Sequence, residues 1–363
     1  MYKKGIALLL AAAAALSLCS CKTAKEAAAD TKITTLTMLK PKEMKGFSNI
    51  IESYEDTHAN VQLKVIDVTD NTNEVYKIYM AALSGHDSDI DIMVTDGIWT
   101  EEFAKKEYIV PTDFEIDRQK YESAAVDFFE SDGKMYALPF ALDIGVIFYR
   151  KDRVEKAPLC IDDVLRDCGG QPVFEKKQDE DLLCTAIELG DDLERAYPYF
   201  AESSGENSGD LKTKFKNGEI NYYCGRSRDY TYFNDYDFEI GGNVGVMIPE
   251  NTVLGGYGIA VSGFSKNKQA AFDFLTYIYD TFNIRDMLKR ECYIPVQKEY
   301  LSDEMFADYN PCMHKIEETI KNASVRISDS EYVKKAWELQ DMLYDSISEN
   351  KTPPALNDIY IKK

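Results

Sequence analysis

The sequence has few of the residues on which metal sites and nucleic-acid sites depend. It contains only 3 His in 363 residues, and no two cysteines after Cys21 have the spacing CxxC, so no metal site is expected. The 42 Lys and Arg stand against 63 Asp and Glu, which gives a formal net charge of −21. This charge repels phosphate backbones, and because no concentrated basic patch is present, the sequence excludes a nucleic-acid partner.

Catalytic and nucleotide-binding motifs are also absent. The sequence has no GxSxG, HExxH, GxxxxGK[ST] or GxGxxG, so no cofactor is expected. The stretch Asp87–Asp91 begins like a calcium loop, but the sixth and twelfth positions are Ile92 and Ile98 instead of Gly and Glu. With 63 acidic residues, close pairs of carboxylates arise by chance, so they do not indicate a glycosidase. Nothing in the sequence requires an enzyme.

The N-terminus has the features of an export signal. Two lysines precede an apolar run, Ile6–Leu18, which is too short to span a bilayer. The residues before Cys21 resemble the lipobox of bacterial lipoproteins, so we expect a signal peptide over residues 1–20, lipidation of Cys21 and a tether over residues 21–30. Cys19 is an alternative acceptor, disfavoured because the bulky Leu18 precedes it. An ordinary cleaved secretory signal would still imply export, and the pairing of the six later cysteines stays open.

Strands and helices alternate through the first third of the exported part. The pattern predicts a strand at Ile33–Leu39, a helix at Glu43–Tyr54, a strand at Val61–Val65 and a later strand at Tyr108–Pro111. This alternation indicates an α/β fold with a mostly parallel sheet covered by helices, and the length leaves room for two domains of ~100–200 residues each. Ligands bind beyond the carboxyl ends of such strands, which includes the loop Thr95–Trp99.

A long apolar run, Met135–Arg150, follows a turn and predicts an extended crossover between two lobes. Pro139 disfavours an uninterrupted central strand within it, because proline has no N–H for the ladder. Further along, Tyr257–Val261 reads as a strand, and Gly255 and Gly256 before it indicate a close backbone approach between lobes.

Aromatic and charged residues gather at the predicted loop edges. The aromatic members are Trp99, Phe140, Tyr149, Tyr222, Tyr223, Tyr230, Tyr232 and Tyr257, and the charged members are Asp96, Asp143, Arg226 and Arg228. Sugars present apolar faces and rims of hydroxyls, so a sugar site needs aromatic platforms with carboxylate or guanidinium partners. The alternative for the aromatic residues is ordinary core packing, and for the two arginines solvated loop positions.

Four segments in order resemble the extracellular solute-binding proteins of family 1, the maltose-binding type that serves ABC importers. These segments are Asp89–Trp99 with Tyr108–Pro111, Asp132–Asp143 with Val146–Asp152, Phe215–Glu219 with Tyr222–Arg226, and Gly255–Ser262 with Ser265–Leu275. The resemblance covers residues 32–350. It implies a two-lobed, type II binding-protein fold whose lobes are joined by hinge crossovers. Lobe 1 is expected over residues 31–138 and about 262–310, and lobe 2 over residues 139–261 and about 311–363.

The resemblance also implies a function and a site. The expected function is a non-catalytic receptor, lipid-anchored in the periplasm or on the outer surface, that passes a small solute to the transmembrane subunits of an ABC permease. Asp143 falls where the family often has a hinge carboxylate that bonds sugar hydroxyls, and Asp96 on the loop acid of the first lobe. Arg226 and Arg228 fall where many members place an aromatic platform, a departure that leaves open an acidic or sulfated mono- or oligosaccharide, or another anion.

The full set of expected ligand-binding residues is Asp96, Trp99, Asp143, Arg226, Arg228, Gly256 and Tyr257.

Two rival functions are compatible with the same fold, because one scaffold can host several functions. One is an exported glycan-cleaving lipoprotein that uses two of these carboxylates, and the other is a surface adhesin without a small ligand.

Overall fold

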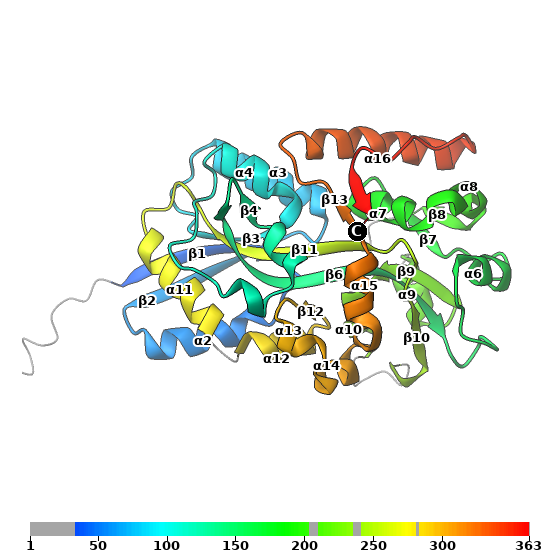
Figure 1. Cartoon of the computed structure of the whole chain (residues 1–363), viewed down its shortest axis with the longest axis horizontal. Helices are drawn as coiled ribbons and strands as arrows, with labels where there is room; N and C mark the ends of the chain where they lie inside the picture. Colours follow the sequence, from blue (N-terminus) through cyan, green and yellow to red (C-terminus); the bar gives the residue numbers. More distant parts are fainter. Residues whose placement is uncertain (1–32, 203–209, 235–240, 281–282, 363) are drawn as a thin grey trace, which may run out of the picture.

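The computed structural model describes residues 33–202, 210–234, 241–280 and 283–362. The expected signal peptide, the tether and Cys21 lie outside these ranges and stay predictions. Within the described ranges, no helix combines the length and the apolar character needed to cross a membrane. Two lobes lie side by side, with long strands running through the middle of the molecule (Figure 1). The predicted two-lobed α/β fold is therefore confirmed.

Lobe 1 is built on three parallel strands, β1 (Thr34–Pro41), β2 (Val61–Val68) and β3 (Ile92–Asp96). β1 lies between the other two strands and pairs with both. Parallel neighbours need a crossover connection, and here α2 (Phe47–Thr57) and α3 (Thr72–Ser84) supply it. The helix α2 buries an apolar stripe with the spacing of one helical face, made of Phe47, Ile50, Ile51 and Tyr54.

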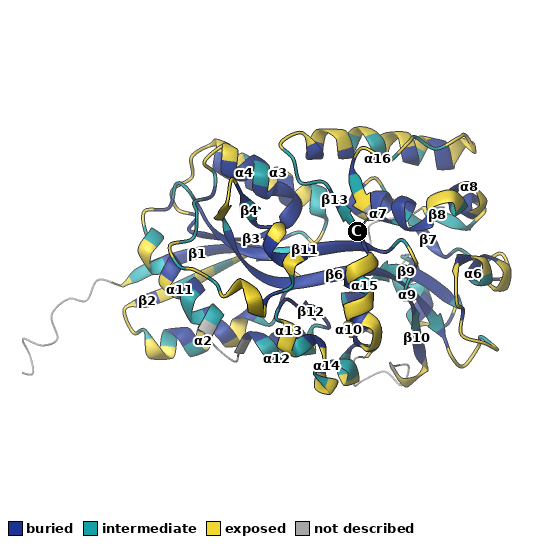
Figure 2. Ribbon diagram, viewed as in Figure 1, coloured by how far each residue is buried: buried dark blue, intermediate teal, exposed yellow. Residues whose placement is uncertain are grey.

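Two long strands join the lobes. The strand β6 (Ala137–Arg150) pairs with β11 (Val253–Val261) over its first half and with β9 (Tyr222–Arg226) over its second half. Both β6 and β11 are buried along nearly their whole length (Figure 2). Their pairing with each other is antiparallel, because β6 runs from lobe 1 to lobe 2 and β11 runs back. The expected crossovers are therefore strands of the sheet itself.

The prediction that Pro139 would interrupt the strand was wrong, because β6 runs through it without a break. The strand accommodates the proline with a bulge of its own. Tyr257 pairs with Ala141 and the next residue, Gly258, pairs with Pro139, so Phe140 of β6 is the extra residue at which the register shifts. Such a bulge lets a residue without an N–H stay inside a sheet. A second prediction, a strand at Tyr108–Pro111, is reduced to one isolated bridge between Ile109 and Ser262.

The remaining elements cover the two ends of this sheet. Those around lobe 1 are η1 (Gly97–Trp99), α4 (Thr100–Lys105), η2 (Arg118–Lys120), α5 (Ser123–Asp127), β4 (Glu130–Ser131), β5 (Lys134–Met135), α11 (Lys268–Asp280), α12 (Asn283–Arg290), β12 (Ile294–Pro295) and α13 (Lys298–Leu301). Those around lobe 2 are α6 (Ile161–Asp167), β7 (Phe174–Lys176), α7 (Glu180–Leu189), η3 (Gly190–Asp192), α8 (Leu193–Ala196), η4 (Tyr197–Tyr199), β8 (Phe200–Glu202), α9 (Leu211–Lys216), η5 (Ser227–Asp229), α10 (Tyr230–Phe233), η6 (Gly241–Asn243) and β10 (Val244–Met247).

The C-terminal part returns to the boundary between the lobes. Its elements are α14 (Glu304–Tyr309), η7 (Pro311–Lys315), α15 (Ile316–Asn322), β13 (Ser324–Arg326), α16 (Tyr332–Glu349) and β14 (Tyr360–Lys362). The strand β13 pairs with the start of β11, and α16 packs on α7 of lobe 2 while also contacting η1 of lobe 1 (Figure 1). Because β6 and β11 belong to both lobes, the residue limits expected for each lobe stay a prediction.

Candidate functional site

A cavity lies at the carboxyl ends of the parallel strands of lobe 1, which is where open α/β sheets place their ligands. We call it the first cavity. It has a volume of about 330 Å³, including space open to solvent. Residues from both lobes and from the crossover β11 line it: Pro41, Glu43, Asp70, Thr72, Val75, Val94, Asp96, Trp99, Arg228 and Tyr257.

The acidic side of the first cavity follows from strand geometry. Glu43 comes just after β1, Asp70 just after β2, and Asp96 is the last residue of β3, so the parallel arrangement brings the three carboxylates to one edge of the sheet. The backbone N–H of Glu43 donates to the Asp70 carboxylate at 2.7 Å. Asp96 accepts from the backbone N–H of Ile98 at 3.1 Å and so caps η1. These bonds fix the loops that hold the acids.

A second cavity lies on the lobe 2 side and is lined mainly by charged and polar residues. Its volume is about 500 Å³. It is lined by Glu175, Lys177, Asp179, Asp181, Leu182, Thr185, Glu188, Tyr223, Cys224, Gly225, Arg226 and Asp229. The two cavities therefore differ in makeup, because the first combines aromatic rings with residues from both lobes and the second is a charged recess of one lobe.

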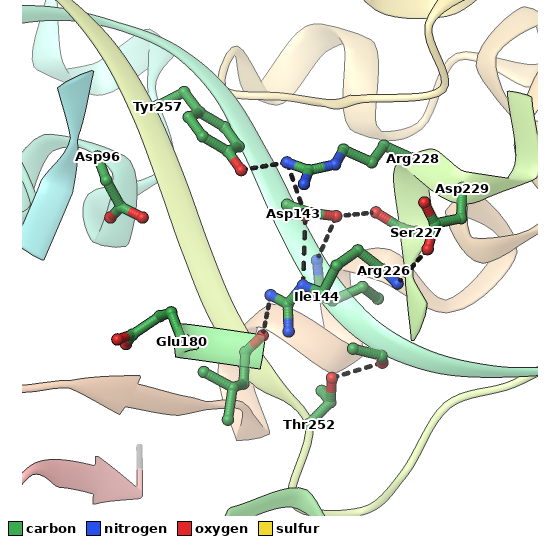
Figure 3. Close-up of polar contacts among 12 residues, drawn as sticks. Asp96, Asp143, Ile144, Glu180, Arg226, Ser227, Arg228, Asp229, Thr252 and Tyr257 are labelled. Atoms are coloured by element: carbon green, nitrogen blue, oxygen red, sulfur yellow. Dashed lines mark hydrogen bonds and ion pairs between the residues drawn. The ribbon is translucent and has the colours of Figure 1, made fainter. Parts of the chain in front are cut away.

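Asp143 lies on β6 between the two cavities and is 2% exposed. Its carboxylate accepts from the Ser227 hydroxyl at 2.6 Å and from the Ile144 backbone N–H at 3.0 Å. Nε of Arg226 donates to its other oxygen at 3.3 Å, and Nη1 of Arg228 lies 3.8 Å from that same oxygen. Figure 3 shows Asp143 between the two guanidinium groups. The hinge carboxylate is thus already saturated by protein partners.

Arg226 is held inside the hinge. Besides Asp143, its guanidinium donates to the Glu188 carboxylate at 3.2 Å and to the Val253 carbonyl at 3.0 Å. Glu188 also accepts from the Val253 backbone N–H at 3.1 Å. Since Arg226 is 11% exposed and binds two carboxylates, it ties β9, α7 and β11 together. This arrangement makes it a poor candidate for free contact with a ligand.

Arg228 reaches across the gap between the lobes. Its Nη2 lies 2.9 Å from the Glu43 carboxylate of lobe 1, and its Nη1 donates to the hydroxyl of Tyr257. The guanidinium carbon also lies 5.6 Å from the centre of the Tyr257 ring, within cation–π distance. Nε of Arg228 is buried and has no hydrogen-bond partner. Other contacts also join the lobes, including the Asn71 side chain donating to Asp179 at 3.3 Å.

A third arginine, which sequence reasoning missed, anchors Asp96. Arg326 of β13 donates to Glu180 at 2.9 Å and lies 3.5 Å from Asp96. Glu180 in turn accepts from the Tyr332 hydroxyl and, at 3.1 Å, from the Gln340 side chain. This cluster joins β3, α7 and the C-terminal segment beside the first cavity. It leaves Asp96 partnered before any solute enters.

Burial raises the pKa of several carboxylates at this site, and two of these carboxylates pair with the arginines. Desolvation raises the pKa of Glu43 to about 7, although the neighbouring Arg228 opposes the shift. Desolvation likewise raises the pKa of Glu188 to about 7, against the opposing charge of Arg226. The Glu43 side chain is 29% exposed and the Glu188 side chain 4% exposed, so burial acts more fully on the pKa of Glu188.

The structure brings part of the expected site together. Asp96, Trp99, Arg228 and Tyr257 line the first cavity, Arg226 lines the second, and Asp143 lies between them. Trp99 is 3% exposed and packs with Tyr76, Tyr79 and Phe103, so it is a core residue with one edge at the cavity.

Gly256 lines neither cavity. A Cβ at this position would lie 2.6 Å from Cδ2 of Phe128, so the glycine serves the close approach of α5 to β11.

The other aromatic candidates differ in their exposure. Phe140, Tyr222, Tyr223 and Tyr230 are buried, and Tyr232 is exposed. The cysteines whose pairing was left open, from Cys160 to Cys312, are all unpaired thiols in the described part of the chain.

Four further residues of the site, Glu43, Asp70, Glu188 and Arg326, were not expected. The first two could have been found, because each follows the end of a predicted parallel strand, where ligands bind. Glu188 lies within a helix rich in acids, and no sequence signal separates it from Asp181. Arg326 is 230 residues away from its partner Asp96, so no local pattern indicates the contact.

Comparison with solved structures defines the class of the fold. The structure of T. maritima MalE3 with maltose bound superposes with a TM-score of 0.78 at 18% identity, covering 88% of this chain and 96% of that one. A solute-binding protein of Thermotoga lettingae bound to α-D-tagatose gives a TM-score of 0.73 at 16% identity, with the same coverages. The fold is that of the type II binding proteins of ABC transporters.

Sequence comparison then gives the family. The model of the bacterial extracellular solute-binding proteins matches residues 40–281, and the chain belongs to this family. The galactooligosaccharide-binding protein of Bacillus subtilis is 29% identical over 164 residues, which are 44% of this chain and 38% of that protein. An uncharacterized ABC transporter extracellular-binding protein of Pyrococcus horikoshii is 25% identical over 129 residues, 34% of this chain and 30% of its own length.

Proposed function

We propose that this protein is a non-catalytic receptor that captures a small carbohydrate between its lobes and presents it to the membrane subunits of an ABC importer. The first cavity carries this proposal, because Glu43 and Asp96 of lobe 1, Arg228 of lobe 2 and Tyr257 of the crossover all face it. A solute held by both lobes stabilises the closed arrangement over the open one, and this differential affinity drives hinge closure.

The chemistry of the first cavity suits a polyhydroxylated solute. Carboxylates accept hydrogen bonds from hydroxyls, the guanidinium of Arg228 donates to them, and the rings of Trp99 and Tyr257 offer apolar surface. Family membership and the carbohydrate ligands named for the T. maritima, Thermotoga lettingae and Bacillus subtilis proteins support the same class of solute. We further propose Asp96, Trp99, Arg228 and Tyr257 as ligand contacts, with Asp143, Arg226 and Gly256 as residues that hold the hinge in shape.

The proposed location is the outer side of a bacterial membrane, to which a lipid on Cys21 anchors the mature chain. Membership of an extracellular solute-binding family and the lipobox-like sequence support this location. Mass spectrometry of the protein purified from bacterial membranes tests it. The expected mature N-terminus is a lipid-modified Cys21, and a mature chain that begins elsewhere without lipid would contradict the anchor.

A thermal-unfolding screen tests the receptor function. The purified protein is heated with neutral mono- and oligosaccharides, uronic and sulfated sugars, amino acids and polyamines. A ligand at a hundred times its dissociation constant adds about 2.7 kcal/mol to the stability of the native state, which raises the melting temperature by several degrees. We expect a hit among sugars that is recovered unmodified after incubation. Conversion of the sugar would favour a glycan-cleaving enzyme, and no hit would favour an adhesin.

A variant pair locates the site. Replacing Tyr257 with alanine removes a ring and a hydroxyl from the cavity wall and should weaken binding of the sugar by about 1–3 kcal/mol. Tyr232→Ala is the matched control, because Tyr232 is exposed on α10 and lines neither cavity. Equal affinities for both variants, measured by isothermal titration calorimetry, would place the ligand elsewhere.

A further inference from the structure

We propose, on the basis of the receptor function above, that Arg228 is the specificity-determining residue that limits the ligand to one uncharged sugar ring. Its guanidinium forms a wall of the first cavity and closes the path toward the second. Neither the size nor the charge of the solute follows from family membership.

The position of Arg228 is fixed from both lobes. Its side chain is 14% exposed, and its two terminal nitrogens contact Glu43 of lobe 1 and Tyr257 of β11. The distance of 5.6 Å from the guanidinium carbon to the Tyr257 ring adds a cation–π contact. A long side chain held at its far end cannot move aside for a ligand without losing these partners. It therefore acts as a fixed boundary of the cavity.

The boundary continues into the hinge. From Arg228 the contacts pass to Asp143 at 3.8 Å and then to Arg226 at 3.3 Å (Figure 3). Arg226 in turn contacts Glu188 at 3.2 Å. The first member of this series lines the first cavity and the last two line the second. The two cavities are consequently separated by a continuous row of ion pairs, and a chain of sugar rings could not extend from one into the other.

The space that remains is small. Even with space open to solvent included, the first cavity has only about 330 Å³, against about 500 Å³ for the second. An oligosaccharide needs several adjoining subsites of this size. This arrangement of the lobes therefore leaves room for no more than one ring, and a longer ligand would have to displace Arg228 and break its contact with Glu43.

The charge of the cavity disfavours an anion. Three carboxylates, Glu43, Asp70 and Asp96, face it against one guanidinium, that of Arg228. Arg228 already pairs with Glu43, and Arg226 already pairs with Asp143 and Glu188. Neither arginine is free to neutralise a ligand carboxylate, because each would first have to give up its own. Of the ligands that the sequence leaves open, this proposal therefore favours an uncharged sugar over an acidic or sulfated one.

Isothermal titration calorimetry with matched probes tests this inference. The probes are glucose, maltose and maltotriose, galactose and its β-linked di- and trisaccharides, and the uronic acids of both sugars. In the wild-type protein we expect one of the monosaccharides to bind at least tenfold more tightly than its trisaccharide and its uronic acid. The variant Arg228→Ala should bind the trisaccharide at least tenfold better relative to the monosaccharide than the wild type does. Arg195→Ala, on the outer surface of lobe 2, is the control and should leave the order unchanged.

A second variant keeps the test valid if Arg228→Ala fails to fold. Glu43→Ala releases the far end of Arg228 from lobe 1 and should shift preference in the same direction by a smaller factor. A trisaccharide or a uronic acid that binds the wild type as tightly as the monosaccharide would overturn the size or charge limit while leaving the receptor function intact. An unchanged preference in both variants would also overturn it, and an absence of binding by every sugar would reject the receptor function itself.

Discussion

Arg226 and Arg228 are two residues apart in the sequence but serve two different regions of the molecule. Arg226 lies within the hinge, where it contacts two carboxylates and a carbonyl of neighbouring strands and helices. Arg228 lies at the edge of the cleft, where its main ion pair is with the opposite lobe. The two side chains are buried to a similar extent, at 11% and 14% exposure, but they have different structural roles. One guanidinium holds the scaffold together, and the other depends on the relative position of the lobes.

The hinge arginine should have the largest effect on stability. Arg226→Ala leaves Asp143 and Glu188 buried without their cation, and breaking a buried pair in this way costs about 3–5 kcal/mol. Urea unfolding followed by circular dichroism measures the loss. A loss below about 1 kcal/mol would mean that the hinge network is not structural, and the comparison between the two arginines would fail.

The charge of Glu188 should make the hinge sensitive to pH. Its pKa rises from 4.5 in the unfolded chain to about 7 in the folded protein, so the native state binds the proton more tightly. Stability from this group is therefore greatest below about pH 4.5 and falls as the pH rises toward 7, by about 3 kcal/mol in all.

Glu188→Gln should remove most of this dependence, because glutamine remains neutral and still accepts from Val253. The measurement compares the unfolding free energies of variant and wild type at pH 5 and pH 7.5. Both proteins keep the dependence that comes from Glu43, so we expect the variant to show a smaller difference between the two pH values than the wild type, but not a zero difference. An identical difference in both proteins would contradict the assignment.

The cleft arginine should matter less for stability than the hinge arginine. Arg228→Ala breaks an interlobe pair whose partner, Glu43, is partly exposed and can be hydrated or protonated, so we expect a loss of about 1 kcal/mol. The same urea unfolding measures it. A loss equal to that of Arg226→Ala would erase the distinction between scaffold and cleft.

A surface arginine gives the baseline. Arg195 pairs with Asp162 and Asp192 at 2.6 Å each, but its side chain is 59% exposed. Exposed pairs contribute ~0–1 kcal/mol, so Arg195→Ala should change the free energy of unfolding by less than about 0.5 kcal/mol. A larger change would show that the number of ion pairs, and not their burial, determines how much each of the three arginines contributes to the free energy of unfolding.

The sequence predicted those parts of the fold that depend on local patterns. Alternating strands and helices gave lobe 1, and the apolar run at β6 gave a crossover between the lobes. Asp96 and Tyr257 were both expected at the site, and the structure places them opposite each other in neighbouring strands. The continuity of β6 through Pro139 could not be predicted, because the bulge at Phe140 beside it is defined only by the pairing with β11, a segment distant in the sequence.

The parts that could not be predicted depend on contacts between distant segments. Arg326 sits in a strand of 3 residues, too short for any period to be visible, yet it pairs with Asp96 and Glu180. Trp99 occupies a predicted ligand loop, but whether its ring faces solvent or core is decided by α3, which packs over it. The roles of Arg226 and Arg228 could not be predicted for the same reason, since their carboxylate partners come from other elements.

The helix α16 carries one of two tryptophans whose fluorescence can report the relative position of the lobes. The chain has only two tryptophans, and both Trp99 of lobe 1 and Trp337 of α16 line one small cavity at the junction of the lobes. The Trp337 ring lies 5.8 Å from that of Tyr76 and is covered by Lys77, both on α3. Any rotation of lobe 1 against α16 changes the surroundings of these indoles. Intrinsic fluorescence should therefore follow opening and closing directly, without an attached dye.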